Sequence, residues 1–106
     1  MTKELLRLHA DVCKTLSHAK RLEILNILRN KEMNAGEIVA RMKVPKANVS
    51  QHLGVMRNAG ILETRRNGTN IYYRISNPKV NKACDLMREV LLEQHAQKAE
   101  LFNRLR

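Results

Sequence analysis

Cysteines, aromatic side chains and long apolar runs are scarce in this chain. Its 106 residues include two cysteines, two tyrosines, one phenylalanine and no tryptophan. Two cysteines far apart in the sequence do not make the disulfide framework of a secreted domain, so we expect free thiols in a reducing compartment. No apolar run approaches the roughly 18 residues that span a bilayer, and the N-terminus has no apolar signal core. These absences favour a cytoplasmic protein with no membrane partner.

Acidic residues are also few, with ten Asp and Glu against twenty Lys and Arg, a net charge of +10. Such an excess favours a polyanionic partner, either nucleic acid or an anionic membrane surface. Residues 41–74 hold seven basic residues and one acidic residue, a balance of +6, whereas residues 1–40 and 75–106 each balance at +2. The charge is therefore concentrated in the middle of the chain, where it predicts a surface for phosphates.

Residues 44–60 predict a helix whose two faces differ in character. Pro45 suits the first turn of a helix, and Gly60 suits a left-handed residue that ends one. Val49, Leu53 and Met56 recur at helical spacing and form a narrow apolar stripe. Short polar groups that can hydrogen-bond to base edges occupy the rest of the surface. The predicted DNA-binding residues of this helix are Lys46, Asn48, Ser50, Gln51, His52 and Arg57.

Three helices are predicted before this one. Residues 3–16 are apolar on more than one side, and Ser17 is expected to cap a buried central helix at residues 18–30. A short connector at residues 31–33 follows. Asn34 and Glu37 have the spacing of a capping box that opens a short helix, and a tight turn then leads into residues 44–60. Two short helices joined by such a turn are typical of a helix-turn-helix, whose second helix enters the major groove.

A basic hairpin is predicted next. Residues 61–66 and 71–75 are rich in strand-forming residues, and Asn67-Gly68-Thr69-Asn70 between them is a strong turn signal. We expect one face of the hairpin to pack on the helices through Leu62, Ile71, Tyr73 and Ile75, which would leave its tip free to reach DNA. The predicted DNA-binding residues of the hairpin are Arg65, Arg66, Asn67 and Arg74.

The last predicted helix covers residues 79–103, after a start signal at Ser76-Asn77-Pro78. It is longer than a domain of this size needs to cover its own core. Its surplus apolar surface predicts a homodimer built from the first and last helices. Residues 1–106 are then one DNA-binding and dimerisation domain, mostly α with a β-hairpin wing.

Several short motifs strengthen the winged helix-turn-helix interpretation. They are Leu16-Ser17-His18 with Arg21-Leu22-Glu23-Ile24-Leu25, Ser50-Gln51-His52-Leu53, Ala59-Gly60-Ile61-Leu62, and Arg66-Asn67-Gly68 with Tyr72-Tyr73. As a set spread over roughly residues 5 to 95, they resemble the ArsR/SmtB family of bacterial transcriptional repressors. The resemblance implies a homodimer that binds double-stranded operator DNA and releases it when a chemical signal binds.

The chain departs from the metal-sensing members of that family. Residues 33–39 contain no cysteine, and in the last helix Asp85 and His95 lack the matching partners of the familiar zinc site. We therefore expect no zinc or nickel at those sites and no bound cofactor.

Cys13 and Cys84 fall one on each of the two helices assigned to the interface. Both can be small buried apolar residues, as cysteine commonly is. Alternatively they form a thiol sensor for oxidants, persulfides or a thiophilic metalloid, provided that the helices bring the sulfurs close enough. A third interpretation pairs His9 with Cys13 on one helix face as ligands of a metal ion.

The preferred function is thus a sequence-specific repressor released by a chemical signal. The alternative is an architectural protein that coats DNA with little sequence preference. A protein-binding winged helix fits the concentrated charge less well. An enzyme is not expected, because no carboxylate pair, phosphate-binding glycine loop or nucleophile-base set occurs.

Overall fold

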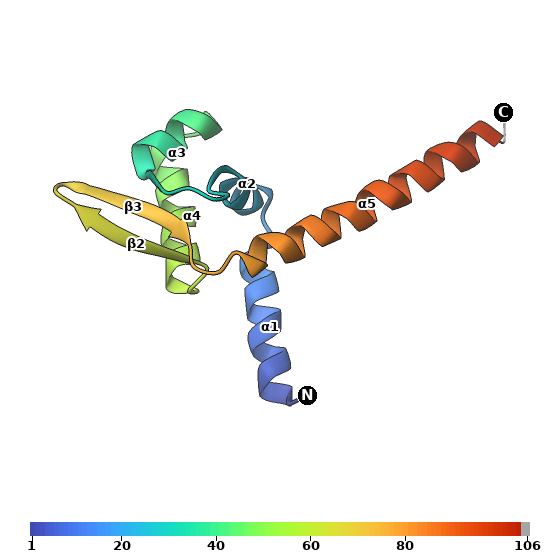
Figure 1. Cartoon of the computed structure of the whole chain (residues 1–106), viewed down its shortest axis with the longest axis horizontal. Coiled ribbons are helices and arrows are strands. Elements are labelled where there is room, and N and C mark those ends of the chain that lie inside the picture. The colour runs from blue at the N-terminus through green and yellow to red at the C-terminus, as the bar shows by residue number, and fades with distance from the viewer. Residues whose placement is uncertain (105–106) are drawn as a thin grey trace.

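The computed structural model describes residues 1–104, apart from the side chain of Phe102. Within that range it contains five helices and a three-stranded antiparallel sheet. The helices α2, α3 and α4 gather beside the hairpin, whereas α1 and α5 leave this body in different directions (Figure 1). The elements are α1 Lys3–Thr15, α2 Ala19–Ile27, β1 Met33–Asn34, α3 Ala35–Met42, α4 Lys46–Asn58, β2 Leu62–Asn67, β3 Asn70–Ile75 and α5 Lys79–Arg104.

The core lies between α2, α3, α4 and the foot of the hairpin. Ile24 and Leu25 of α2 are buried, which confirms that this helix is the centre of the fold. Ile38 of α3 and the predicted stripe of α4 cover it from the other side. The remaining buried apolar residues are Ile27, Leu28, Met33, Met42, Ile61 and Leu62.

Local signals set the ends of the helices at the helix-turn-helix. The predicted capping box is confirmed, since Glu37 N donates to Asn34 Oδ1 at 2.8 Å and Asn34 N donates to Glu37 Oε1 at 3.1 Å. Gly60 has φ +78°, the left-handed conformation predicted for it. Pro45 is the N-cap of α4 rather than a residue of its first turn.

The predicted role of Ser17 and the extent of the second helix were wrong. The Ser17 hydroxyl donates to the Lys14 carbonyl at 2.7 Å, so it serves the end of α1, and His18 is the N-cap of α2. Helix α2 ends at Ile27, and Asn30 adopts a left-handed φ of 57°. Asparagine tolerates that conformation and is common just after a helix end.

The connector before α3 is part of the sheet, which the sequence did not predict. Met33 and Asn34 form β1 and pair with Tyr73 and Tyr72 of β3, giving the strand order β1-β3-β2. A two-residue strand has no periodicity from which it could be recognised. Its pairing fixes the base of the hairpin to the start of α3.

The hairpin forms as predicted, and its ladder extends one rung further toward the turn. Asn67 pairs with Asn70 as the last rung of the ladder, so Gly68 and Thr69 are the central residues of the turn. Gly68 has φ +65°, which suits a turn with glycine at its first central position. Ile71 was wrongly expected to pack on the helices with Tyr73 and Ile75, since it is 37% exposed and does not join the core.

The two terminal helices carry most of the exposed apolar surface. No residue of α1 is buried, and every described residue of α5 from Glu89 to Leu101 is exposed. At about 1.5 Å per residue, α5 is roughly 39 Å long, well beyond the body it starts from. No helix within residues 1–104 is long and apolar enough to cross a bilayer. The exposed large apolar residues of these helices are Leu5, Leu6, Leu8, Leu86, Met87, Val90, Leu91, Leu92 and Leu101.

Candidate nucleic-acid interface

Helix α4 packs against the core through an apolar stripe, so its polar face is exposed. Val49, Leu53 and Met56 are each 0% exposed. Because successive residues are separated by about 100° around a helix, Gln51 lies roughly 140–160° from all three. It therefore projects directly away from the core. The other exposed residues predicted for this face are Lys46, Asn48, Ser50 and Arg57.

His52 packs between helices instead of lying on the outer face with Gln51. Its Nδ1 accepts a hydrogen bond from Arg21 Nε at 3.1 Å, and its ring centroid is 6.1 Å from that of His18. Arg21 also donates to the Thr15 carbonyl at 3.0 Å and so joins the end of α1 to α4. Since His52 lies only about 40° from Met56 around the helix, its spacing already favours packing over a DNA contact.

This contact makes the stability of the fold sensitive to acid. Burial lowers the pKa of His52 below 6.5, and the charges of Arg21 and His18 lower it further. The folded state therefore favours the neutral ring, so this contribution is present above about pH 6.5 and is lost as the pH falls further. We expect the Tm of the wild type to drop more between about pH 7.5 and 5.5 than that of His52→Asn, whose carbonyl keeps an acceptor for Arg21 without titrating. Equal drops in Tm would contradict this role.

The arginines of the hairpin are not equally available to DNA. Arg65 Nε donates to Glu32 Oε1 at 2.6 Å, and its guanidinium lies 4.8 Å from the centroid of the Tyr72 ring. Arg74 Nε donates to Glu63 Oε1 at 2.6 Å near the foot of the hairpin. Arg66, next to Asn67 at the tip, is exposed and makes no ion pair with any described residue. It is therefore the hairpin arginine best placed for a phosphate.

Three exposed residues near this face were missed from the sequence. Val55 follows Gln51 by four residues and lies on the outward side of α4. Arg41 and Lys43 are exposed at the turn between α3 and α4. The sequence did carry a signal for Val55, because a residue four positions after Gln51 lies on the same face of the helix.

Comparison with known proteins agrees with this geometry. Residues 18–64 match the model of the bacterial regulatory protein, arsR family. The transcriptional repressor PagR of Bacillus anthracis is 40% identical over 82 residues, which cover 76% of this chain and 82% of PagR. This chain belongs to the ArsR family. ArsR-family proteins are DNA-binding transcriptional regulators and not enzymes, as expected from the sequence.

Solved structures extend the ArsR-type likeness over most of the chain. The crystal structure of Mycobacterium tuberculosis Rv0081 has a TM-score of 0.81 at 31% identity and covers 92% of this chain and 99% of its own. The crystal structure of PagR has a TM-score of 0.73 at 39% identity, and the match covers 81% of this chain and 99% of PagR. The homodimeric winged helix-turn-helix domain of Mb0332 from Mycobacterium bovis has a TM-score of 0.76 at 30% identity. The match covers 88% of this chain and 89% of that domain. The winged helix-turn-helix fold is confirmed.

The cysteines of this ArsR-family chain are both free thiols. Cys13 is exposed on α1, whereas Cys84 is half-buried on α5 and packs against the core. Among the described residues, no group of three or more His, Cys, Asp and Glu side chains could hold a metal ion. Cys13 and the exposed His9 on α1 remain a pair of potential ligands without a third partner among those residues.

Proposed function

We propose that this protein is a homodimeric, cytoplasmic repressor that binds double-stranded operator DNA and releases it on a chemical signal. The observation that carries the proposal is the position of Gln51, which stands outward on a helix held by three fully buried residues. A rigidly seated helix with a polar outer face is what base readout in the major groove requires. The relative PagR is itself named a transcriptional repressor.

We assign sequence specificity to the outer face of α4, and much of the affinity for the DNA backbone to the hairpin and the ends of α4. In this proposal Asn48, Ser50 and Gln51 read base edges, and Val55 offers an apolar contact for a thymine methyl group. Arg66 and Asn67 at the hairpin tip contact the backbone, with further phosphate contacts from Lys46 and Arg57 at the ends of α4 and from Arg41 and Lys43 at the turn before it. The ion pair of Arg65 with Glu32 ties the hairpin to the segment before β1, and that of Arg74 with Glu63 joins its two strands.

Affinity for a selected duplex, compared with a random duplex of equal length, tests this function. We expect selection from a random-sequence pool to yield a site bound at least about 10³-fold more tightly than random DNA at the same salt concentration. A ratio near one would support the architectural alternative, since binding would then depend on backbone charge alone.

The exposed apolar faces of α1 and α5 support the dimer. Leu5 and Leu8 on α1 and Met87 and Leu91 on α5 are each more than half exposed in the single chain. Contiguous apolar surface of this kind marks an association site. A second copy is the partner we propose, because the similar domain of Mb0332 is described as homodimeric.

The cysteines are the candidate sensor within this proposal. Val12 and Leu16 at the end of α1 and Val80 and Cys84 at the start of α5 all pack against the same core, so both helices that carry a cysteine are attached to one body. Joining the two sulfurs as a disulfide removes two protons and two electrons, which an added diamide takes up as it becomes a hydrazine. A new bond between the two helices would change how α5 leaves the body.

Loss of one thiol should abolish this response without changing the reduced protein. We expect diamide to lower the operator affinity of the wild type at least about tenfold, and dithiothreitol to restore it. Cys84→Ser and Cys13→Ser should bind DNA like the reduced wild type and ignore diamide, because serine is similar in size but cannot form the bond. Fluorescence anisotropy with labelled duplex measures the affinity, and mass spectrometry follows both thiols. Normal release from Cys84→Ser would exclude the sensor.

A further inference from the structure

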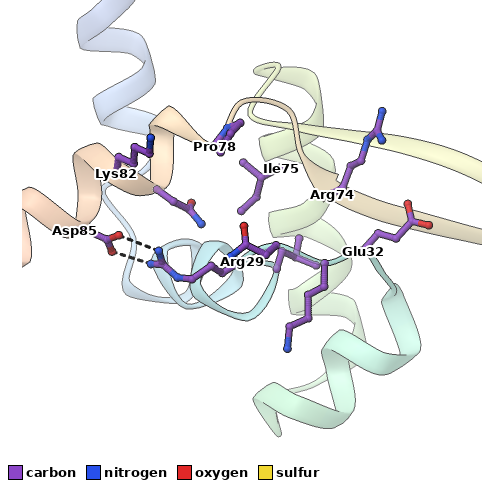
Figure 2. A pocket seen from close by; sticks show the side chains of 11 residues that line it. Arg29, Glu32, Arg74, Ile75, Pro78, Lys82 and Asp85 are labelled. Carbon is purple, nitrogen blue, oxygen red and sulfur yellow. Dashed lines mark hydrogen bonds and ion pairs between the residues drawn. The ribbon is translucent and has the colours of Figure 1, made fainter.

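A cleft of about 570 Å³ lies where three elements meet. These are the segment that follows α2, the foot of β3 and the first turns of α5 (Figure 2). Leu28, Ile75 and Pro78 give it apolar walls, and Figure 2 shows Ile75 and Pro78 across the space from Arg29 and Asp85. The cleft is separate from the outward face of α4, and none of the residues predicted to read bases lines it.

The rim of the cleft carries more positive than negative charge. Arg29, Lys31, Arg74 and Lys82 line it against Glu32 and Asp85, a balance of +2. Each of the two carboxylates already has an arginine partner, because Asp85 pairs with Arg29 and Glu32 with Arg65. Lys31 and Lys82 make no ion pair with any described residue. Arg74 is already paired with Glu63, which does not line the cleft, so the lysines provide the unneutralised charge.

We propose that this cleft binds a small organic anion, a carboxylate carried on an apolar body. The apolar body lies against Leu28, Ile75 and Pro78, while the carboxylate pairs with Lys82 of α5 at the rim. Burial of the body supplies the affinity, and the charge selects anions over neutral molecules of the same shape. A bare inorganic anion gains only the weak contact with exposed lysines.

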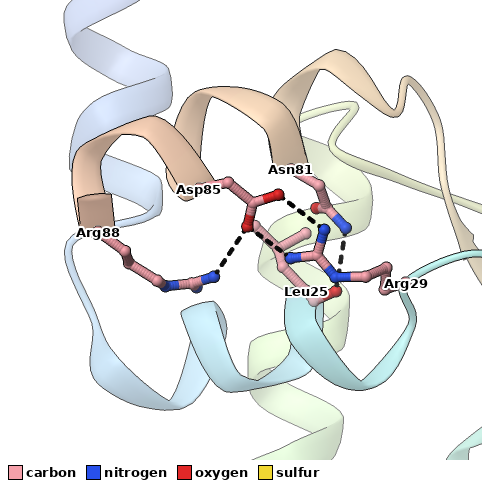
Figure 3. A network of polar contacts seen from close by, with 5 residues as sticks. All are labelled: Leu25, Arg29, Asn81, Asp85 and Arg88. Carbon is pink, nitrogen blue, oxygen red and sulfur yellow. Dashed lines mark hydrogen bonds and ion pairs between the residues drawn. The ribbon is translucent and has the colours of Figure 1, made fainter.

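The cleft also lies beside the contacts that hold α5 to the body. Arg29 grips Asp85 with two hydrogen bonds of 2.7 and 2.8 Å, and Arg88 reaches the same carboxylate at 3.4 Å (Figure 3). The pKa of Asp85 lies below its usual range, mainly because Arg29 donates these bonds. The carboxylate is therefore ionised at neutral pH and holds α5 in place.

The side chain of Asn81, at the contact between α5 and α2, lacks a full set of hydrogen bonds. Asn81 is only 6% exposed, and its Nδ2 makes a long 3.4 Å bond to the Leu25 carbonyl. Its Oδ1 has no hydrogen-bond partner among the described residues, which is costly for a buried acceptor. Few polar contacts thus hold α5 to α2 and the segment that follows it, so an anion that joins Lys82 of α5 to the apolar wall at Leu28 and Ile75 shifts α5. This regulatory step rests on the proposed function, in which α5 sets the spacing of two DNA-reading helices.

Binding is tested on the full chain by NMR titration of the ¹⁵N-labelled protein with benzoate, benzyl alcohol and inorganic phosphate. We expect benzoate to give saturable shifts that are largest for the amides of residues 28–32, 75 and 81–85, benzyl alcohol to give the same shifts only at higher concentration, and phosphate to give none. Lys82→Ala should weaken benzoate binding by about threefold to fivefold, as expected for loss of one exposed charge contact. Lys79→Ala is the matched control, because Lys79 is an exposed lysine of the same first turns that does not line the cleft. Absence of saturable shifts, or equal losses in both variants, would overturn the proposal.

DNA binding provides a second readout that separates this inference from the proposed function. Saturating benzoate should lower operator affinity in the wild type and in Lys79→Ala, and the dose that does so should rise in Lys82→Ala. If benzoate binds in the cleft but operator affinity is unchanged, the regulatory step is wrong and the site stands. If the protein binds no specific DNA at all, the proposed function fails, while the NMR titration still decides the site.

Discussion

A Leu91→Glu variant should stay folded as a single chain and lose operator affinity by a factor of about 10² to 10⁴. Leu91 is 55% exposed and lies beyond the part of α5 that touches the body, so a charge there disturbs no contact within the chain. In the proposed dimer the same charge is buried without a partner, which disfavours association strongly. A single chain reaches one half-site and loses the benefit of binding both at once.

The neighbouring leucine offers a matched control. Leu91 follows Met87 by four residues and lies about 40° from it around the helix, whereas Leu92 lies about 140° away. Leu92→Glu adds the same charge at a position that is 70% exposed, and it should leave the dimer and DNA binding nearly unchanged. Light scattering after size exclusion gives the oligomeric state, and circular dichroism checks the fold. A dimeric Leu91→Glu protein, or a monomeric wild type at micromolar concentration, contradicts the proposed interface.

Features specified by nearby residues were predicted well from the sequence. The apolar stripe of α4 follows from helical spacing, and the capping box of α3 from two residues three positions apart. The glycine turn of the wing has a local signal of the same kind. Even here the predicted loop was too long by one residue at each end, because Asn67 and Asn70 can serve either as turn residues or as the last rung of the ladder.

Features that depend on distant pairs were missed. The strand β1 exists only because β3 lies beside it, and its two residues have no pattern of their own. The contacts of Arg21 with His52 and of Arg29 with Asp85 join residues 31 and 56 positions apart. Nothing in the spacing along one helix identifies such partners. The cleft at the start of α5 was missed for the same reason, since its walls come from three separate elements.

These long-range contacts connect the two terminal helices to α4. Arg21 joins the end of α1 to α4 through Thr15 and His52. Arg29 joins α2 to the start of α5 through Asp85. Both terminal helices therefore contact the body through α2, whose apolar residues also support α4. In the proposed function, a signal that moves either terminal helix acts on α4 through this shared support.

Gln51→Ala should lower the affinity for the selected operator much more than the affinity for random DNA. Gln51 points directly away from the buried stripe, where its amide can make two hydrogen bonds with an adenine edge. We expect the variant to lose about 1–3 kcal/mol on the selected operator and almost nothing on random DNA. Preference should be relaxed at one base pair of each half-site, as measured by anisotropy with a set of singly substituted duplexes.

Arg66→Ala should give the opposite pattern, which makes the two variants controls for each other. An exposed arginine at the wing tip contacts phosphates, so its loss weakens selected and random DNA alike. The slope of log affinity against log salt concentration should fall by about one in magnitude, whereas Gln51→Ala should leave that slope unchanged. Equal losses of Gln51→Ala on operator and random DNA would show that α4 does not read sequence through this side chain. The concentrated positive charge would then account for binding, as in the architectural alternative.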